Sequence, residues 1–292
     1  MIIKKYDLSI IIPYYNDEKG IIKLVESIPQ SDRIELIIIN DHSASISWIL
    51  AQYNHVEIKY YLQTEGNRWA GAARNYGLSL AQGKFIMFAD SDDYFVSGAF
   101  DIIFNYITLD FDIVYFPPTS VNENGKKSLR HTKYSDLVTS YLNKKDEAIR
   151  YEFFVPWSKL YKSELIYKHN IQFDEVIASN DVMFSLKTGV MGRNFKVSSD
   201  TIYCVVESST SLTKIFSEEV VDSRFDVLCN YNTFIAKNLC PAKKISTISC
   251  ISRARRIGFY KMLYVLFYSL HKGYPILPDS NGFKRWLKRF FS

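Results

Sequence analysis

The sequence of 292 residues lacks several features that define other classes of protein. Its four cysteines form no CxxC pair and lie in segments with the composition of folded structure, so reduced, buried thiols are expected rather than disulfides or a zinc site. No low-complexity tract or repeat of fixed period is present, which argues against a solenoid. The apolar run Met262–Leu270 is far shorter than the about 20 residues that span a bilayer. The N-terminus has no secretory signal pattern, which predicts a cytoplasmic protein.

The charge is distributed unevenly along the chain. The net charge is +5, but the residues after 250 contain nine lysines and arginines and only one acid, Asp279, so the first 250 residues carry a net charge of −3. A mildly acidic body with a basic tail favours an anionic membrane surface over a nucleic-acid groove. The segment Phe283–Phe291 mixes bases with aromatic residues, which predicts a reversible membrane-surface anchor. A helix packed on the main domain is the alternative.

Apolar runs alternate with helical patterns through the first 110 residues. Strands are predicted over 9–16, 34–40 and 56–63, and a fourth over the five apolar residues 85–89 that run into the acidic segment. Helices are predicted after Asn16 as N-cap, over about 44–53, and over about 69–81 with Gly83 as C-cap. This alternation predicts a mostly parallel sheet whose strands all end at the same edge. The polar residues that follow these strands are therefore expected at that edge, where open α/β sheets bind ligands.

The acidic segment that follows the fourth predicted strand contains three carboxylates in four positions, Asp90, Asp92 and Asp93. Carboxylates this close repel one another, and a hard divalent cation that carries substrate phosphates would keep them ionised. The segment therefore predicts a metal and nucleotide site. An acidic turn that caps the next helix is the alternative, and helix capping is the expected role of Asp93.

Four motifs stand in order at the predicted strand ends: Ser-Ile-Ile-Ile-Pro-Tyr-Tyr-Asn (9–16), Asn-Asp-His-Ser (40–43), Gly-Ala-Ala-Arg-Asn-Tyr-Gly-Leu (71–78) and Asp-Ser-Asp-Asp (90–93). With these motifs the chain resembles the inverting glycosyltransferases of family 2, which have the GT-A fold. The resemblance is close over residues 8–110. It continues to about residue 213 through Pro-Trp-Ser-Lys-Leu-Tyr (156–161) and Ser-Asn-Asp-Val-Met-Phe (179–184).

The resemblance implies an α/β fold with a Rossmann-like, mostly parallel mixed sheet flanked by helices. The GT-A domain would cover residues 1–215, with a nucleotide-binding half over 1–110 and an acceptor half over 111–215. A helical, basic C-terminal extension would cover residues 216–292. The polar stretch 117–135 is predicted to form a hairpin or loop over the site.

The resemblance also assigns a nucleotide-sugar site to Pro13, Tyr15, Asp41, Asn67, Arg74, Asp90 and Ser91. Tyr15 would stack on the base and Asp41 would accept the N3–H of uracil. A tyrosine at the rim of the protein and an N-cap for the following helix are the respective alternatives. Asp92 would bind Mg²⁺ or Mn²⁺ that bridges the two phosphates.

The resemblance assigns the general base to Asp181, which would take the proton of the acceptor hydroxyl. Family members usually have Glu-Asp here, whereas this chain has Asn180 before Asp181. A helix-capping role is the alternative for Asp181. Trp157 and Lys159 would shape the acceptor pocket, and a place in the core is the alternative for Trp157.

Together these features predict a metal-dependent, inverting transferase that moves a sugar from a UDP-sugar to a hydroxyl of a glycan or lipid-linked acceptor in cell-surface polysaccharide biosynthesis. It would work in the cytoplasm, at the inner face of the cell membrane, without nucleic acid as a partner. A nucleotidyltransferase of similar fold is one alternative, but the glycine- and lysine-rich loop it needs is missing at Tyr14–Asn16. An inactive carbohydrate-binding scaffold is another, and intact Asp92 and Asp181 argue against it.

Overall fold

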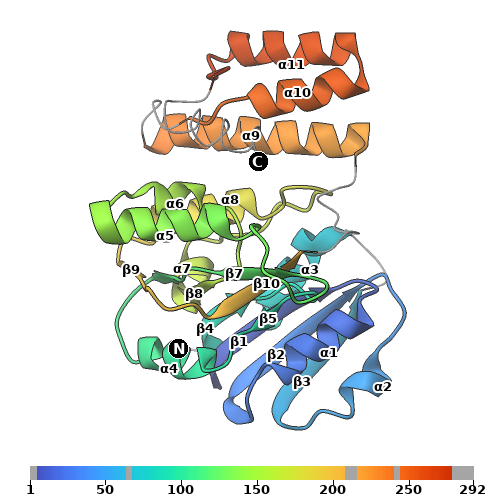
Figure 1. Ribbon diagram of the computed structural model, residues 1–292, viewed down its shortest axis with the longest axis vertical. Helices are drawn as coiled ribbons and strands as arrows, with labels where there is room; N and C mark the ends of the chain where they lie inside the picture. The colour runs from blue at the N-terminus through green and yellow to red at the C-terminus, as the bar shows by residue number, and fades with distance from the viewer. Residues whose placement is uncertain (1–4, 64–67, 208–215, 240–243, 278–292) are drawn as a thin grey trace. The chain divides into compact units, whose positions relative to one another are not determined.

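The computed structural model describes residues 5–63, 68–207, 216–239 and 244–277 (Figure 1). It divides into two compact units. The larger unit comprises residues 1–176 and 180–211, and the helical unit comprises residues 177–179 and 212–292. Asn67 and the predicted anchor 283–291 lie outside the described residues.

The larger unit is built on a seven-stranded sheet. In sheet order its strands are β3 (Val56–Gln63), β2 (Ser31–Asp41), β1 (Tyr6–Tyr14), β4 (Gly83–Phe88), β8 (Lys159–Lys162), β6 (Ile113–Tyr115) and β9 (Phe195–Val197). Strands β1 to β4 run parallel, whereas β8 is antiparallel to both of its neighbours. The predicted mostly parallel, mixed sheet is therefore confirmed.

A second, three-stranded sheet follows the acidic segment. It consists of β5 (Tyr94–Phe95), β10 (Tyr203–Glu207) and β7 (Thr119–Asn122), with β10 in the middle. Strand β10 is antiparallel to β5 and parallel to β7. The predicted polar hairpin over 117–135 corresponds to β7 and a tight turn, in which the Asn122 side chain accepts the backbone N–H groups of Asn124 and Lys126, each at 3.0 Å.

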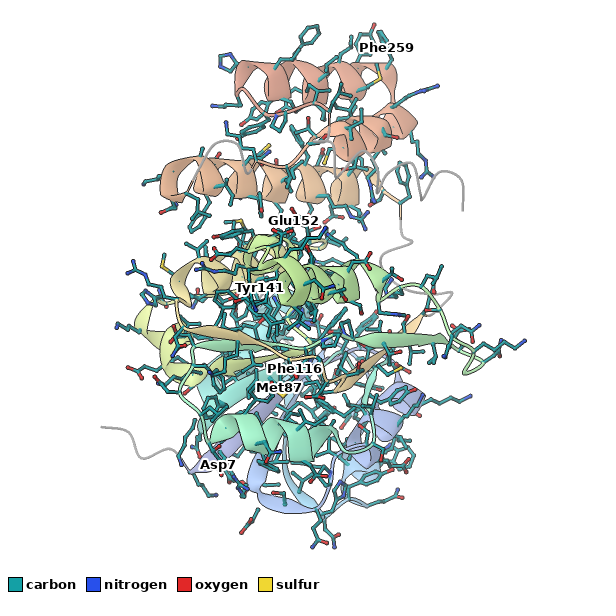
Figure 2. The ribbon with its side chains drawn as sticks, turned by 60° about the vertical axis from the view of Figure 1, so that its left-hand side comes forward. Asp7, Met87, Phe116, Tyr141, Glu152 and Phe259 are labelled. Atoms are coloured by element: carbon teal, nitrogen blue, oxygen red, sulfur yellow. The ribbon has the colours of Figure 1, made fainter. Side chains whose placement is uncertain are left out.

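The helices of the larger unit are α1 (Glu18–Glu26), α2 (Ser47–Leu50), α3 (Trp69–Leu80), α4 (Ala99–Ile107), α5 (Thr132–Lys144), α6 (Ala148–Glu152), α7 (Ser163–Lys168) and α8 (Val182–Met191). The inner parts of the central strands, residues 10–12 of β1 and 85–88 of β4, are apolar because side chains on both faces of these strands are buried. Met87 of β4 and Phe116 are completely buried in this core (Figure 2).

Several predicted helix ends are wrong. Helix α2 covers Ser47–Leu50 and not about 44–53, and two predicted caps are wrong by one or two residues. Helix α1 is capped by Asp17, whose carboxylate accepts the Gly20 N–H at 3.0 Å, whereas Asn16 has a positive φ of 48°. Gly83 is the first residue of β4 and does not cap α3. A Cβ at Gly83 would lie 2.5 Å from the Ser9 backbone nitrogen, so glycine permits the close approach of β4 to β1.

The helical unit contains α9 (Glu218–Asn238), α10 (Ile248–Ile257) and α11 (Phe259–His271) (Figure 1). Ser217 caps α9 by accepting the Val220 N–H at 3.2 Å. The helices pack around a separate apolar core that includes Phe225, Leu228 and Val265. None of the helices in the described residues is long and apolar enough to cross a membrane.

Candidate functional site

The carboxyl ends of the four parallel strands lie at one edge of the large sheet. Tyr14 of β1 lies opposite Asn40 of β2, and Asp41 lies opposite Gln63 of β3. The Ala89 N–H donates to the carbonyl oxygen of Ile11 at 3.2 Å, so the acidic segment leaves the sheet beside β1. The parallel topology thus delivers residues from four separate motifs to the same edge.

The acidic cluster at this edge consists of Asp90, Asp92 and Asp93. One carboxylate oxygen from each lies within 4.8 Å of the others. Burial and the neighbouring Asp90 raise the pKa of Asp92 to about 7, because removing a carboxylate from water and placing it beside another both disfavour ionisation. Binding of a cation would therefore stabilise this cluster more than it stabilises exposed carboxylates at a protein surface.

The three carboxylates have different partners. Asp93 is 2% exposed and accepts the N–H of Val206 at 2.7 Å, which ties the acidic segment to β10. Its predicted role as a helix cap is wrong, because α4 begins at Ala99 after Gly98. Asp90 is paired with Arg74, whereas Asp92 makes no ion pair with a described residue. Asp92 is thus the carboxylate best placed to take an external cation.

The cluster fits a hard divalent cation. It offers carboxylate oxygens only, the ligands that Mg²⁺ and Mn²⁺ prefer. Burial and repulsion by Asp90 raise the pKa of Asp92, and such a cation would relieve the repulsion. Asp92 would hold the ion, since Arg74 already engages Asp90 and a hydrogen bond from Val206 engages Asp93.

Arg74 connects the acidic cluster to a second segment of the chain. It lies on α3, is 5% exposed, and donates through Nη2 to the Asp90 carboxylate and through Nη1 to Asn180 Oδ1 at 3.0 Å. Its guanidinium also lies over the Phe173 ring, 5.4 Å from the centroid. Arg74 thereby holds Asp90 together with Asn180, which lies 106 positions from Arg74 in the chain.

Glycine allows α3 to approach the segment that contains Asn180. A Cβ at Gly71 would lie 2.1 Å from the Asp174 carbonyl oxygen and 3.1 Å from the Asn180 Cβ. No larger residue fits there without moving the backbone. The small residue in the first turn of α3 therefore lets the helix approach Asn180 closely enough for the Arg74 side chain to reach it.

Asp181 follows Asn180 and immediately precedes α8. Its side chain makes no capping hydrogen bond, so the alternative of a simple helix cap is not what the structure contains. Burial raises the pKa of Asp181 to about 6, while the positive charge of Arg74 opposes the rise and the negative charge of Asp90 adds to it. Asp181 and the acidic cluster thus share one electrostatic environment around Arg74. A carboxylate with such a pKa can accept a proton near neutral pH.

Asp41 lies at the end of β2 and has two partners. One carboxylate oxygen accepts the N–H of Trp69 at 2.9 Å, and the other lies 2.7 Å from His42 Nδ1. It does not cap α2, which begins at Ser47. Tyr15 follows β1 and is 50% exposed, so part of its surface is available to a ligand. Binding of a nucleobase by these two residues stays a prediction.

Asn40 and Pro13 also lie at this edge. Asn40 is fully buried and organises the turn after β2, where its side chain bonds Ser43, Ala44 and Tyr60. Pro13 lies within β1 opposite Ile39. Ser91 packs closely on α1, since a Cβ at Gly20 would lie 2.6 Å from its carbonyl oxygen.

The structure buries Trp157 and Lys159, the two residues predicted for the acceptor pocket. Trp157 is packed among aromatic rings, and Lys159 Nζ donates to the carbonyl oxygen of Phe153 at 2.6 Å. Burial lowers the pKa of Lys159 well below its usual range. The core position that was the alternative for Trp157 is therefore observed, and acceptor contact by either residue stays a prediction.

Tyr203 is a supporting residue that the motifs did not reveal. Its hydroxyl oxygen accepts the backbone N–H of Asp90 at 2.9 Å, and its ring stacks on Trp157 with centroids 5.6 Å apart. Tyr203 thus holds the acidic turn from the core side. No local pattern could have identified it, because the contact spans 113 positions of the chain.

Comparisons with known proteins agree with this geometry. The model of the family described as "Glycosyl transferase family 2" matches residues 9–169. EpsH of Bacillus subtilis (strain 168), whose name describes a glycosyltransferase, is 25% identical over 243 residues, which cover 79% of this chain and 70% of EpsH. The poly(ribitol-phosphate) beta-N-acetylglucosaminyltransferase TarS of Staphylococcus aureus (strain Mu50 / ATCC 700699) is 27% identical over 203 residues, which cover 67% of this chain but only 34% of TarS.

The crystal structure of S. aureus TarS 1-349 in complex with UDP-GlcNAc is similar to this structure. It has a TM-score of 0.65 at 21% identity and covers 86% of this chain and 73% of that chain. A mannosyltransferase from Pyrobaculum calidifontis in complex with GDP-Man and Mn²⁺ has a TM-score of 0.51 at 13% identity and covers 91% of this chain and 79% of that chain. At these identities the matches concern the fold, and they confirm the predicted GT-A fold.

Proposed function

Because this chain belongs to glycosyl transferase family 2, we propose that it transfers a sugar from a UDP-sugar to a hydroxyl of a glycan or lipid-linked acceptor, with inversion and with help from a divalent cation. TarS, a relative of this chain, is named for transfer of N-acetylglucosamine to poly(ribitol-phosphate), and its fold binds UDP-GlcNAc. An acceptor in cell-surface polysaccharide synthesis is consistent with that name.

The observation that carries the proposal is the pair of hydrogen bonds made by Arg74. One goes to Asp90 in the acidic cluster and the other to Asn180, the neighbour of Asp181. A displacement at a sugar carbon needs a site for the leaving group and a base on the opposite side of the sugar. Arg74 links the residues that would supply both.

Asp90, Asp92 and Arg74 would receive the diphosphate of the donor. A bound Mg²⁺ or Mn²⁺ supplies charge neutralisation for the departing nucleoside diphosphate. The Arg74 guanidinium is already held in place by two hydrogen bonds and the Phe173 ring, so little reorganisation is needed when the phosphates arrive. Asp41, which ends β2, and Tyr15, which follows β1, would contact the base together with Pro13, and Asn67 would belong to the same nucleotide-sugar site.

Asp181 would act as the general base. Its carboxylate takes the proton from the acceptor hydroxyl, the oxygen forms a bond with the anomeric carbon, and the bond from that carbon to the diphosphate oxygen breaks. Asn180 is uncharged, so the Arg74 cation is shared between Asp90 and Asp181 and is not neutralised by a third carboxylate. Asp181 can therefore be ionised near neutral pH despite its burial.

The test is a thermal-shift series with UDP-, GDP- and dTDP-sugars, with and without Mn²⁺. We expect stabilisation with a UDP-sugar that requires the cation, since a ligand that binds only the folded state raises its stability. Asp92→Ala should remove the cation-dependent shift and donor hydrolysis, while Asp110→Asn, a change at an exposed carboxylate, should keep both. No shift with any donor would contradict the proposal, and pyrophosphate release from a nucleoside triphosphate would favour a nucleotidyltransferase.

The predicted location belongs to the same proposal. Transfer to a lipid-linked acceptor would place the enzyme at the inner face of the cell membrane, with residues 283–291 as a peripheral anchor. The composition of that segment, four bases among aromatic and apolar residues, supports this assignment.

A further inference from the structure

Helix α11 has an outward face made of apolar and aromatic side chains. Phe259, Tyr260 and Phe267 are each more than 60% exposed, and Tyr264 and Leu270 are each more than half exposed. These five residues fall on one side of the helix, whereas Val265 and Ser269, on the other side, are buried. Phe259 lies at the outer edge of the helical unit (Figure 2). The side of α11 that faces solvent, which is polar in most surface helices, is thus apolar in this protein.

The charged residue of α11 points the other way. Lys261 donates to Asp222 at 2.7 Å and to Glu218 at 3.1 Å, both on α9. With the cation turned inward and the rings turned outward, α11 leaves an aromatic surface that the described residues do not cover. An exposed surface of this kind marks an interaction site more often than chance exposure of single residues does.

The segment that forms α10 and α11 carries positive charge only. From Val227 to Pro278 there is no aspartate or glutamate, and there are eight lysines and arginines. Arg255 and Arg256 of α10 are exposed and precede Phe259 by four and three residues. A second copy of this chain would bring like charges together, whereas an anionic surface would complement them.

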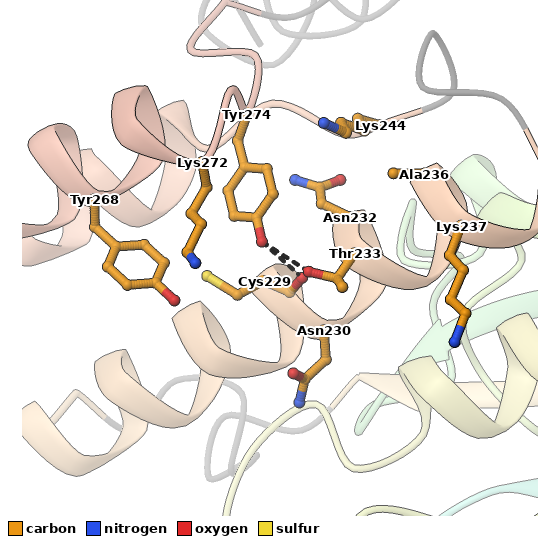
Figure 3. Close-up of a pocket in the computed structure, with 10 residues that line it drawn as sticks. All are labelled: Cys229, Asn230, Asn232, Thr233, Ala236, Lys237, Lys244, Tyr268, Lys272 and Tyr274. Carbon is orange, nitrogen blue, oxygen red and sulfur yellow. Dashed lines mark hydrogen bonds between the residues drawn. The ribbon is translucent and has the colours of Figure 1, made fainter.

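A pocket of the same unit continues this positive character. Lys237, Lys244 and Lys272 line it, and its described lining contains no acidic residue (Figure 3). The Tyr274 hydroxyl joins the end of the α10–α11 hairpin to α9, through Thr233 Oγ1 at 2.9 Å and the Cys229 carbonyl oxygen at 3.2 Å (Figure 3). These hydrogen bonds hold the α10–α11 hairpin, residues 248–271, on α9. The outward face of α11 therefore belongs to a helix that is fixed in place.

We propose that the outward face of α11, with the arginines of α10 beside it, docks on the surface of an anionic lipid bilayer. Tyrosine and phenylalanine rings enter the interfacial region of a bilayer, and nearby arginines are attracted to anionic headgroups. A soluble polyanion would match the charge but would leave the rings in water, so a lipid surface fits both features. The assignment does not depend on the proposed transferase activity, and it concerns residues other than the 283–291 segment.

The test is co-flotation of the full chain with vesicles of phosphatidylcholine alone or mixed with phosphatidylglycerol. We expect binding to the mixed vesicles in about 0.1 M salt and loss of most of it in about 1 M salt, where the screening length falls from about 10 to about 3 Å. Phe259→Ser/Tyr264→Ser/Phe267→Ser and Arg255→Gln/Arg256→Gln should each weaken binding about tenfold or more.

The matched control is Trp48→Ser/Leu129→Ser, which makes the same kind of change at exposed apolar residues of the larger unit and should leave binding unchanged. Circular dichroism would verify that each variant is folded. The proposal is overturned if the α11 variant binds like the wild type, or if Trp286→Ser/Phe290→Ser alone abolishes binding. It is equally overturned if soluble polyphosphate competes fully at low salt, or if the wild type does not bind and forms a dimer instead.

Discussion

The acidic edge of the larger unit and the α10–α11 hairpin of the helical unit both gather charge of one sign, but they hold it differently. At the edge, burial and mutual repulsion raise the pKa of Asp92 to about 7, and Arg74 or a backbone N–H engages its neighbours. In the hairpin, Arg255 and Arg256 are exposed to water. A buried charge depends on a specific partner, whereas exposed charges act together and tolerate single changes.

The largest expected effect is that of Asp181→Asn. If Asp181 is the general base, the rate of sugar transfer should fall by about 10²- to 10⁴-fold, while stabilisation by the donor is kept. The measurement is the transfer rate together with a thermal-shift titration of the donor. Asp174→Asn is the control, because it changes a second part-buried carboxylate of the same segment and should cost little activity. An Asp181→Asn variant with nearly normal transfer would refute the base assignment.

Asp92→Asn should separate function from stability. We expect a loss of transfer of about 10²- to 10³-fold, because stabilisation of the leaving group is lost. Without added cation the variant should be more stable than the wild type, since the change relieves repulsion between Asp92 and Asp90. Melting temperatures with and without Mn²⁺ would measure this. A variant that is less stable than the wild type in metal-free buffer would show that Asp92 is a structural residue.

Arg74→Gln tests how much a buried charge at the acidic edge contributes to stability and activity. The change leaves Asp90 without its cation and Asn180 without one donor, so we expect a loss of stability of about 2 kcal/mol and a fall in transfer of at least about tenfold. Arg74→Lys keeps the charge but cannot reach both partners with a planar fork, and an intermediate effect should follow. Denaturant unfolding would give the free energies. Equal behaviour of the two variants would argue that charge alone matters.

The pH dependence of transfer should report Asp181. Because its pKa is raised to about 6, the rate should fall about tenfold per pH unit below pH 6 as the base takes up a proton. The contribution of Asp181 to the free energy of unfolding depends on pH in the opposite direction. A carboxyl with a raised pKa in the folded protein contributes stability that is present below its unfolded pKa and is lost as the pH rises through 6. A transfer rate that falls at pH 5 while the melting temperature does not fall would agree with this prediction. A transfer rate that does not change with pH would contradict it.

The smallest expected effect is that of Arg255→Gln in the hairpin. Arg255 is exposed and makes no ion pair within the described part of the chain, so its free energy of unfolding should change by less than about 0.5 kcal/mol. Comparison with Arg74→Gln under the same conditions isolates the effect of burial. A similar cost for both arginines would break the distinction between the two regions.

Much of the larger unit could be predicted because its signals are local. The apolar runs of β1 to β4 have the composition of strands buried on both faces, and β3 begins and ends as predicted. The ends of strands and helices were less accurate. Asp17 and not Asn16 caps α1, and Gly83 starts a strand, because both choices depend on close contacts with distant segments.

The site was predictable only in part for the same reason. Asp90, Asp92 and Asp41 follow strands, so the topology alone brings them to one edge. Tyr203, which holds Asp90, and the burial of Trp157 and Lys159 have no local signal. The outward-facing rings of α11 were also unpredictable, because a short apolar helix is compatible with a buried position.

The sequence by itself determined the family, the order of strands and helices, and the positions of the acidic residues, because short-range patterns and motifs carry that information. Only the tertiary structure decided which carboxylates share Arg74, that Asp17 and not Asp41, Asp93 or Asp181 caps a helix, and which side of α11 faces water. These outcomes depend on contacts between residues far apart in the chain, and the energy of each such contact is set by burial and distance, which no local pattern contains.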